Sequence, residues 1–470
     1  GRFSLLNNKD LTGSLSLSGN SELNVPQGTA LVINQSGNLQ LNQKKLAFSG
    51  EGKLTFKNSI NISGGELQAG DGTLEFNAGG SVAKLTLDNT TLVLQDDLTI
   101  GEIFKTTGTE PTLQFNNNSL DLTSDNVQMQ LGTSLDLNNI TTSEKTALLL
   151  SADSTLSRSS AFTLGSINLQ NHALSLGSAE SDLTVTGSVT FGSTSSQINT
   201  GGADLSLQSA VSLADGKLSS TAGTLAFEQG AALGNNAVLD FSASKIKLSG
   251  LLDISGGTLT SSSTSNLGLQ SASSLSSSAQ FTIPTLDLNG RKLSLNSATT
   301  HLVISSPFTA GTNESVDTKA GSLTFNGTAT LENEAAIESS SGTLTFNGNV
   351  SLDNSSILLT GGSALFNSAA QISGGELKLY DSSLTLAAGV SMTNSSKLSL
   401  KNTNFAGSSK VAITGGTLEL GGTIGNLSSV QSDTNTSLEL NSDTTISRTD
   451  PMEAGGLNLK TFSLTLGSAT

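Results

Sequence analysis

The chain contains no cysteine and no tryptophan, and it has one tyrosine and five prolines among 470 residues. Without cysteine, disulfide cross-links and thiolate metal sites are excluded. Charged residues make up only 13% of the chain, about half the usual ~25%. Apolar runs such as Ala147–Leu150 are only a few residues long, too short to span a bilayer as a helix. The net charge of −16 is dispersed along the chain, and it disfavours nucleic acids and anionic membranes as partners.

Short alternating segments fill most of the sequence. Leu, Ile, Val and Phe alternate with polar residues over four or five positions, and Gly, Asn or Ser separates one segment from the next. Such alternation predicts strands with one buried face. A helix is not expected, because positions i+3 and i+4 from an apolar residue are usually turn residues.

These segments recur at a nearly constant interval along the chain. The interval from Phe56 to Phe76 is 20, and that from Phe325 to Phe346 is 21. Intervals of 21, 20, 20 and 19 separate Leu379, Leu400, Leu420, Leu440 and Leu459. Asn-Gly pairs at 289, 326 and 347 would suit a hairpin meander, but a meander gives no reason for this interval. A coil of three strands around one axis does give that reason.

We therefore predict an all-β fold, a right-handed parallel β-helix (β-solenoid) with three short strands per coil of about 19–21 residues. The right hand is predicted because a left-handed solenoid usually needs a strict hexapeptide repeat. We expect residues 1–470 to form a single continuous β-helix. The pattern is already under way at Gly1 and stops inside a repeat, so we expect a fragment of a longer chain.

The sequence also contains longer repeats, in addition to the interval of about 19–21 residues. Blocks 148–179, 267–298 and 438–469 align without a gap, and their apolar positions and turn residues persist while surface positions change. A second signature, Ile-[Ser/Thr]-Gly-Gly-[Thr/Glu]-Leu, begins at Ile62, Ile254, Ile372 and Ile413. Paired glycines permit left-handed backbone where adjacent coils crowd, so this signature predicts corners of the coil.

The chain resembles the β-helical passenger or stalk regions of Gram-negative type V secreted surface proteins, that is, autotransporters and filamentous-haemagglutinin-like adhesins. The resemblance lies in the Ile-Ser-Gly-Gly-Thr-Leu turns, in strands such as Leu286–Leu295, and in the Ser/Thr/Asn/Gly-rich, cysteine-free composition. It extends over nearly the whole chain. It implies an extracellular or cell-surface protein whose secretion and anchoring modules lie elsewhere.

Residues that could carry chemistry are few, and each has a simpler interpretation. Asp96 and Asp97 lie between Leu94 and Leu98, where a strand corner is expected. His172 lies in a turn whose equivalents in other copies are Lys44, Asn118, Arg291 and Phe462, as expected of a solvated turn. His301 opens an alternating run without a neighbouring cysteine or aspartate.

Two arginines, Arg158 and Arg448, occupy equivalent positions in the first and third blocks, whereas the second block has Ser277 there. This difference argues against a shared catalytic role, and we expect their stems to cover apolar surface. Ice binding is disfavoured because outward positions such as Lys378, Ser399 and Glu419 mix charges. We predict no catalytic, cofactor-binding or metal-binding residue.

The sequence thus favours a structural or adhesive shaft of a bacterial cell-surface or secreted protein, forming a rigid rod or filament segment without catalytic activity. Its partners are expected to be other protein or glycan surfaces, contacted through loops or tip domains not seen in this segment, and self-association into filaments is possible. Nucleic acid binding and membrane insertion by this segment are not expected. The alternative is a polysaccharide-binding or polysaccharide-degrading β-helix, which would carry clustered carboxylates and a groove along one sheet.

Overall fold

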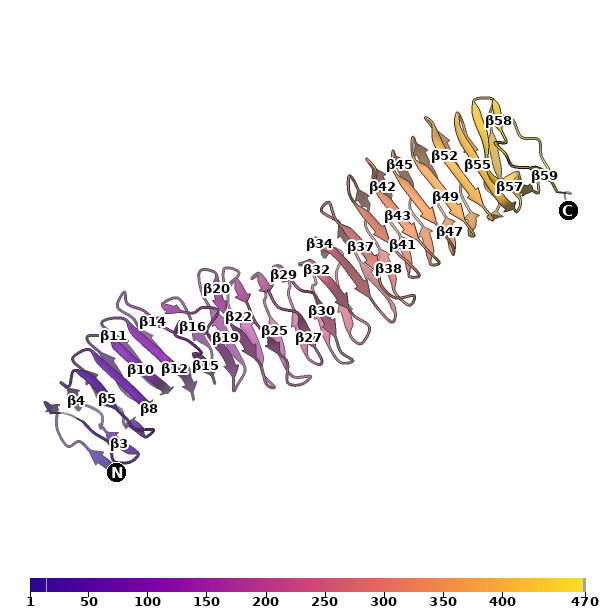
Figure 1. The fold of residues 1–470 in the computed structure, drawn as a ribbon. Helices are drawn as coiled ribbons and strands as arrows, with labels where there is room; N and C mark the ends of the chain where they lie inside the picture. Colours follow the sequence, from indigo (N-terminus) through magenta and orange to yellow (C-terminus); the bar gives the residue numbers. More distant parts are fainter. Residues whose placement is uncertain (14, 468–470) are drawn as a thin grey trace. The chain divides into compact units, whose positions relative to one another are not determined.

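The structure, a computed structural model, describes residues 1–13 and 15–467. Strands make up 55% and helix 1% of it, and parallel sheets stack as a β-solenoid (Figure 1). The chain divides into two compact units. Unit 1 comprises Gly1–Glu228 and Asn236–Asp240, and unit 2 comprises Gln229–Asn235 and Phe241–Thr470. The right-handed winding and the continuity of one β-helix over residues 1–470 stay predictions.

Unit 1 consists of strands in parallel sheets. The first sheet contains β1 (Arg2–Ser4), β3 (Ser21–Asn24), β5 (Gly37–Gln40), β6 (Lys45–Ser49), β8 (Ile60–Gly70), β10 (Gly80–Asp88), β12 (Leu98–Thr107), β14 (Leu120–Asp121), β15 (Gln128–Leu131), β17 (Ile140–Thr141), β18 (Ala147–Leu150), β21 (Ser166–Asn168) and β24 (Val189–Thr190). The second contains β2 (Lys9–Leu11), β4 (Ala30–Ile33), β7 (Lys53–Phe56), β9 (Thr73–Phe76), β11 (Thr91–Leu94) and β13 (Thr112–Gln114). A third sheet contains β16 (Leu135–Asp136), β19 (Ser154–Ser157), β22 (Ala173–Leu176), β25 (Gln197–Asn199), β28 (Lys217–Ser219) and β31 (Val238–Asp240). Another sheet contains β20 (Phe162–Leu164), β23 (Leu183–Val185), β26 (Leu205–Leu207), β27 (Val211–Leu213) and β29 (Thr224–Phe227).

Unit 2 has three main sheets. One contains β30 (Ala231–Leu233), β32 (Lys245–Asp253), β34 (Asn266–Ser276), β36 (Thr285–Asp287), β37 (Lys292–Leu295), β40 (Ser315–Asp317), β43 (Ala336–Ser339), β46 (Ser356–Leu359), β49 (Glu376–Tyr380), β52 (Ser396–Lys401), β55 (Gly416–Ile424), β57 (Thr436–Ile446), β58 (Gly456–Asn458) and β59 (Leu464–Leu466). The second contains β35 (Gln280–Ile283), β38 (His301–Ile304), β41 (Ser322–Phe325), β44 (Thr343–Phe346), β47 (Ser363–Phe366), β50 (Ser383–Leu386) and β53 (Asn404–Gly407). The third contains β39 (Phe308–Ala310), β42 (Ala329–Glu332), β45 (Val350–Asp353), β48 (Ala370–Ser373), β51 (Val390–Thr393), β54 (Val411–Ile413) and β56 (Val430–Ser432). Unit 2 also holds β33 (Thr258–Thr260) and one 3₁₀ helix, η1 (Leu427–Ser429).

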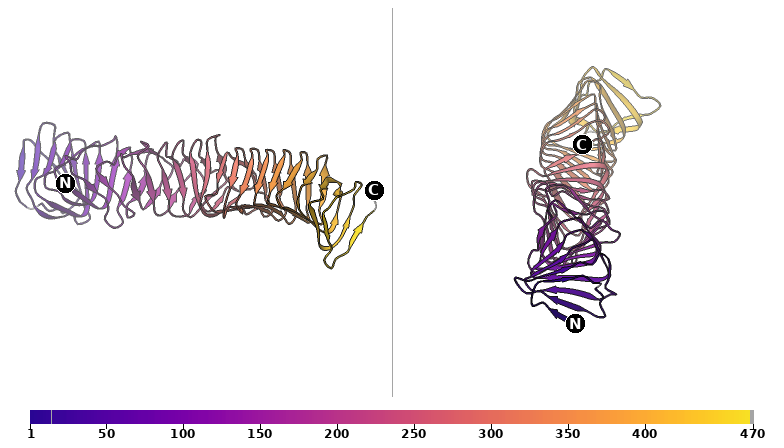
Figure 2. Two further views of the ribbon diagram at one scale, coloured as in Figure 1. Left: turned by 90° about the horizontal axis from the view of Figure 1, so that it is seen from above. Right: turned by 90° about the vertical axis from the view of Figure 1, so that its left-hand side faces the viewer.

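From β37 to β55 the strands follow one another through the three sheets in a fixed order, so β43, β44 and β45 make one coil and β46 begins the next. Each strand pairs in parallel with its equivalent one coil later, as Figure 2 shows in two further views. Ile337, Ile357, Leu377 and Leu398 are successive partners, and the intervals between them are 20, 20 and 21. The predicted three-strand coil is therefore confirmed.

Coil length varies more where turns are longer. In unit 1, Leu67 pairs with Leu85 at an interval of 18, whereas Phe104 pairs with Met129 at an interval of 25. The strands must keep their inward side chains in register to stack, but a solvated turn between them can gain residues without disturbing the core. The predicted coil length thus describes the regular coils, and the turns account for the departures.

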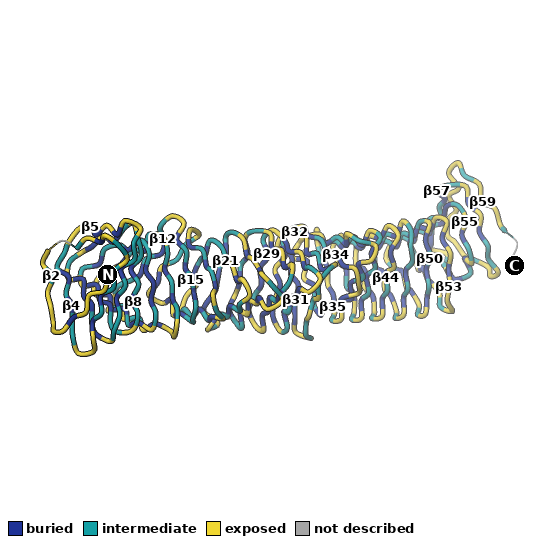
Figure 3. The backbone as a smooth tube through the Cα atoms, turned by 90° about the horizontal axis from the view of Figure 1, so that it is seen from below, coloured by how far each residue is buried: buried dark blue, intermediate teal, exposed yellow. Residues whose placement is uncertain are grey.

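The core of each unit is a column of inward side chains, and buried positions alternate with exposed ones along the strands (Figure 3). Phenylalanines at equivalent positions stack on each other inside it. Phe56 and Phe76 lie 5.0 Å apart between ring centroids. In unit 2, Phe325 lies 5.3 Å from Phe346, which lies 4.8 Å from Phe366. The recurring interval of the sequence therefore appears in space as direct contact.

Buried hydroxyl groups close several corners of the coils. Thr90 Oγ1 donates to the carbonyl of Ala69 (2.7 Å), and Ser355 Oγ donates to that of Leu331 (2.9 Å). A carbonyl that turns away from its sheet needs such a donor when it is buried. Serine and threonine are small enough to provide a hydroxyl donor where coils stack closely. This requirement explains part of their abundance in the chain.

The three repeat blocks share their final strands: β21 and β22 in the first, β36 and β37 in the second, β58 and β59 in the third. The first and second blocks also have an equivalent preceding strand, β20 and β35, whereas the third block has none between β57 and β58. Pro451 lies there, and proline lacks the N–H that a ladder requires. Residues 468 and 469 of the third block lie outside the described residues.

Candidate functional site

Asp96 and Asp97 lie in the exposed turn between β11 and β12. Asp96 Oδ1 accepts the backbone N–H of Asp97 (2.9 Å). Asp97 Oδ1 accepts the backbone N–H (2.7 Å) and the hydroxyl (3.0 Å) of Ser119 in the next coil. The two carboxylates therefore have different partners, and that of Asp97 links two successive turns, as expected of a strand corner.

Each histidine side chain contacts one polar side chain among the described residues. His172 Nδ1 lies 3.7 Å from Asp153 Oδ1, and His301 Nε2 lies 2.9 Å from Thr324 Oγ1 on β41. Burial lowers the pKa of His301, which favours its neutral form. Among the described residues, neither imidazole contacts both a hydroxyl and a carboxylate, the arrangement that a nucleophilic triad requires.

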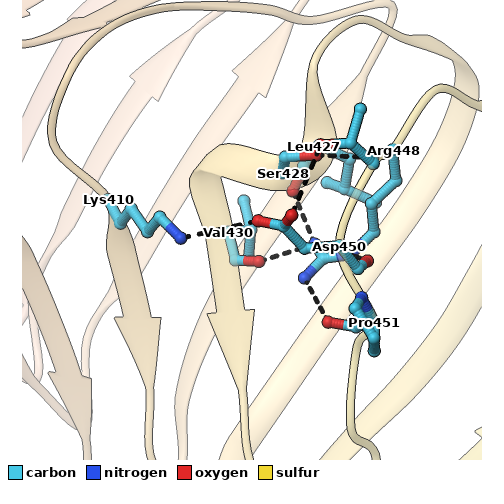
Figure 4. A network of polar contacts seen from close by, with 8 residues as sticks. Lys410, Leu427, Ser428, Val430, Arg448, Asp450 and Pro451 are labelled. Carbon is cyan, nitrogen blue, oxygen red and sulfur yellow. Dashed lines mark hydrogen bonds and ion pairs between the residues drawn. The ribbon is translucent and has the colours of Figure 1, made fainter. Parts of the chain in front are cut away.

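Arg448 is the centre of a polar network near the end of unit 2 (Figure 4). Its Nη1 donates to the carbonyls of Leu427 and Val430, both at 2.7 Å. Its Nε donates to the carbonyl of Asp450 (2.5 Å), and its Nη2 donates to that of Pro451 (2.9 Å). Burial lowers the pKa of Arg448, and the charge of Asp450 partly opposes this effect. The guanidinium group therefore joins the loop between β57 and β58 to the coil before it.

Arg158 makes two comparable contacts in unit 1. Its Nη1 donates to the carbonyl of Ile140 (3.3 Å) in the preceding coil, and its Nε donates to Ser160 Oγ (3.2 Å) just after it in the chain. Arg448 uses the same two atoms at the same sequence separations, toward Val430 and Asp450. Sequence reasoning assigned only stem packing to these arginines and missed this clamp, because carbonyl partners leave no mark in the sequence.

Glu75 is a mostly buried carboxylate on the outward face of β9. Lys53 Nζ lies 2.8 Å from its Oε2, Thr55 Oγ1 donates to Oε2 (3.0 Å), and Gln95 Nε2 donates to Oε1 (3.4 Å). Burial by itself raises the pKa of Glu75, but these hydrogen bonds and the charge of Lys53 together bring the pKa below its ordinary value. The four side chains come from three successive coils, so the cluster fastens those coils to one another.

Two grooves contain the signature that the sequence marks with paired glycines. The first Gly-Gly-Glu groove, in unit 1, has a volume of about 700 Å³ and is lined by Gly64, Gly65 and Glu66 together with Lys44, Lys45 and Lys84. The second Gly-Gly-Glu groove, in unit 2, has about 720 Å³ and is lined by Gly374, Gly375 and Glu376 together with Glu334, Asn354 and Ser356.

The glycines shape both grooves. Gly64 and Gly374 have left-handed backbone, with φ of 66° and 68°. A Cβ on Gly65 would lie 2.3 Å from the carbonyl oxygen of the preceding coil, and one on Gly375 would lie 2.6 Å from the equivalent oxygen. Only glycine lets the chain turn here and lie against the coil before it. The corner is therefore sharply bent and closely packed against the preceding coil.

Each glutamate belongs to a similar ladder of charges. Glu66 is the register partner of Lys84 in the next coil, and Glu376 is that of Lys397. Lys84 Nζ then lies 3.2 Å from Glu102 Oε2, and Lys397 Nζ lies 3.2 Å from Glu419 Oε2. In addition, Glu66 Oε1 accepts the hydroxyl of Thr86 (2.7 Å), and Glu376 forms an ion pair with Lys378.

Sequence reasoning found these corners but not the grooves. Of the four copies of the signature, only those at Ile62 and Ile372 carry glutamate, whereas Thr258 and Thr417 replace it in the others. The available signal was that each glutamate is followed about one coil later by a lysine. That spacing is 18 for Lys84 and 21 for Lys397, so a fixed period does not reveal it.

A third groove, of about 780 Å³, adjoins the first, because Glu102 lines both. Asp125, Glu144 and Lys145 lie in it, and Lys145 Nζ is 2.7 Å from Asp125 Oδ1. The hydrogen bond and the charge of Lys145 lower the pKa of Asp125. Carboxylates and lysines therefore follow one another along a single side of unit 1.

Within residues 1–13 and 15–467, no group of three or more His, Cys, Asp or Glu side chains is arranged to hold a metal ion. In that same part of the chain, no helix has the length and apolar character needed to cross a membrane.

No protein-family model matches this chain, and comparison with curated proteins and with solved structures gives no match.

Proposed function

We propose that this chain is a structural and adhesive shaft of a bacterial cell-surface or secreted protein, and that it acts without catalysis. The observation that carries the proposal is the in-register parallel stacking of each unit around a continuous aliphatic core. Each coil contacts mainly its neighbours, so stiffness accumulates coil by coil, and length changes by adding or removing coils. The absence of cysteine and the dispersed negative charge support an exported, soluble segment.

Deletion of whole coils tests the mechanical part of this proposal. Leu323, Leu344 and Ala364 are successive register partners, so removing residues 323–363 takes out two coils and rejoins equivalent positions. The shortened chain is expected to fold and to lose about 10 Å of maximum dimension in solution scattering, at ~4.8 Å per coil. A control deletion of residues 344–353 removes half a coil and is expected to unfold unit 2. Unfolding by the two-coil deletion would refute the shaft model.

A polysaccharide-degrading enzyme is the second candidate, because the grooves of unit 1 hold carboxylates along one side. Incubation of the full chain with acidic and neutral polysaccharides, with and without Ca²⁺, separates the two functions. We expect no release of reducing ends. Turnover that a single substitution abolishes would replace the shaft proposal with an enzymatic one.

A further inference from the structure

The hexapeptide Ile-Ser-Gly-Gly-Glu-Leu occurs twice without change, at 62–67 in unit 1 and at 372–377 in unit 2. Each copy lines one of the grooves of about 700 Å³, a volume typical of ligand sites. In each, the glutamate faces a register-paired lysine that binds a second glutamate at 3.2 Å. A corner needs the glycines, but its folding does not require this repeated set of charges.

The copy with threonine provides an internal contrast. Thr417 takes the place of the glutamate in the copy that begins at Ile413, and its partner in the next coil is Ser437. That corner keeps both glycines without a carboxylate at this position and without a lysine in the next coil, although Lys397 of the preceding coil is the register partner of Thr417. A Gly-Gly corner therefore forms without the glutamate, which indicates that the glutamate has a role other than shaping the corner.

The lining of the two grooves indicates which ligands both could bind. The first holds three lysines (Lys44, Lys45 and Lys84) beside Glu66 and Glu102, whereas the second holds Glu334 and Glu376 and no lysine. An anionic ligand would suit the first and be repelled by the second, and a cationic ligand the reverse. What the grooves share is polar backbone and one carboxylate that accepts hydrogen bonds. A neutral ligand rich in hydroxyl groups fits both.

The extent of the grooves favours a chain of sugars over a single ring. Residues of the second groove come from four successive coils, from Thr312 to Glu376, and those of the first come from five, from Asn20 to Glu102. At ~4.8 Å per coil, these spans are about 14 Å and about 19 Å. One sugar ring would occupy only part of such a length.

We propose that both Gly-Gly-Glu grooves bind neutral oligosaccharides, and that Glu66 and Glu376 accept hydrogen bonds from sugar hydroxyls. This binding goes beyond the shaft function, since it places glycan contacts on the side of the solenoid and does not depend on a tip domain. The glycines allow the ligand to approach the backbone, and the lysine of the next coil holds the ladder in place. No bond is made or broken in the ligand.

Isothermal titration calorimetry of the full chain tests the proposal, with cellohexaose, maltohexaose and mannohexaose as neutral probes and hexagalacturonate as the anionic contrast. At least one neutral hexamer is expected to bind at two sites per chain. Glu66→Gln and Glu376→Gln are each expected to weaken one site at least tenfold, and the double variant to weaken both. Glutamine preserves the volume of glutamate and the acceptor for Thr86, so folding is expected to survive, which thermal unfolding checks.

Matched controls lie outside the grooves. Glu51 and Glu338 are exposed, and their glutamine variants are expected to bind like the unaltered chain. The proposal is overturned if no neutral hexamer binds, if the double variant binds as well as the unaltered chain, or if only hexagalacturonate binds. Because coil deletion tests the shaft without any ligand, failure of glycan binding and failure of the shaft are separate results.

Discussion

Replacing Phe346 by leucine tests whether aromatic stacking holds successive coils together. Phe346 is fully buried, and its ring lies between those of Phe325 and Phe366, at centroid distances of 5.3 and 4.8 Å and interplanar angles of 4° and 20°. Each such pair contributes about 0.5–1.5 kcal/mol beyond its buried area. Loss of two pairs should therefore cost about 1–3 kcal/mol, in addition to the cost of the smaller side chain.

Hydrogen exchange measured by mass spectrometry gives the local effect, which a global unfolding curve of a repeat protein can hide. From the loss of stacking alone, amides of β44 and its neighbouring strands are expected to exchange about 5- to 150-fold faster, the equivalent of about 1–3 kcal/mol. Distant coils should not change, because each coil contacts mainly its neighbours.

Phe241→Leu is the control for this experiment. Phe241 is also fully buried in unit 2, and no ring stacks on it within the described part of the chain. Its replacement by leucine costs the free energy lost with the smaller side chain, but no stacking between rings is lost. Equal effects of the Phe346 and Phe241 variants would refute the stacking argument.

Three further changes test other contacts. Lys53→Met leaves the carboxylate of Glu75 without its cation and should cost about 1–3 kcal/mol at neutral pH, measured by urea unfolding. The folded pKa of Glu75 lies below its ordinary 4.5, so the ionised carboxylate stabilises the fold above pH 4.5, and this stabilisation is lost as the pH falls through the folded pKa. The difference in stability between the variant and the unaltered chain should therefore shrink in acid. A difference that does not depend on pH would contradict the role of Lys53. Gly342→Ala places a Cβ 1.7 Å from a carbonyl oxygen of the preceding coil, which should lower the melting temperature at a cost of at least about 1–3 kcal/mol. Gly311→Ala is the control, because a Cβ there meets open space and should leave the melting temperature unchanged. Arg448→Lys should speed hydrogen exchange only in the loop between β57 and β58, because an ammonium group cannot bond four carbonyls in a fixed fork. Unchanged exchange there would show that the clamp contributes no stability.

Several parts of this structure could be read from the sequence. The alternation around Leu323 and Phe325 predicts which side chains face inward, and the interval of 21 between Phe325 and Phe346 predicts that they become neighbours in successive coils. The paired glycines at 64 and 374 predict left-handed corners. In each case the pattern reflects local backbone geometry, which neighbouring residues determine together.

The ladders around the grooves could not be read in this way. The interval between Glu66 and Lys84 is 18, and that between Glu376 and Lys397 is 21, yet both pairs are register partners. Which residue lies beside which depends on the length of the intervening turns, and turns vary without a repeating pattern. The carbonyl partners of Arg448 were equally hidden, because a backbone oxygen is present at every position.

The sequence by itself therefore determined the period, the alternation of inward and outward side chains, and the stacking of short strands into coils, because these follow from the strand's two-residue repeat and the need to bury one face. Only the tertiary structure decided which outward residues meet across coils. That choice depends on the register of each strand pair, and the register is set by turns whose lengths change from coil to coil.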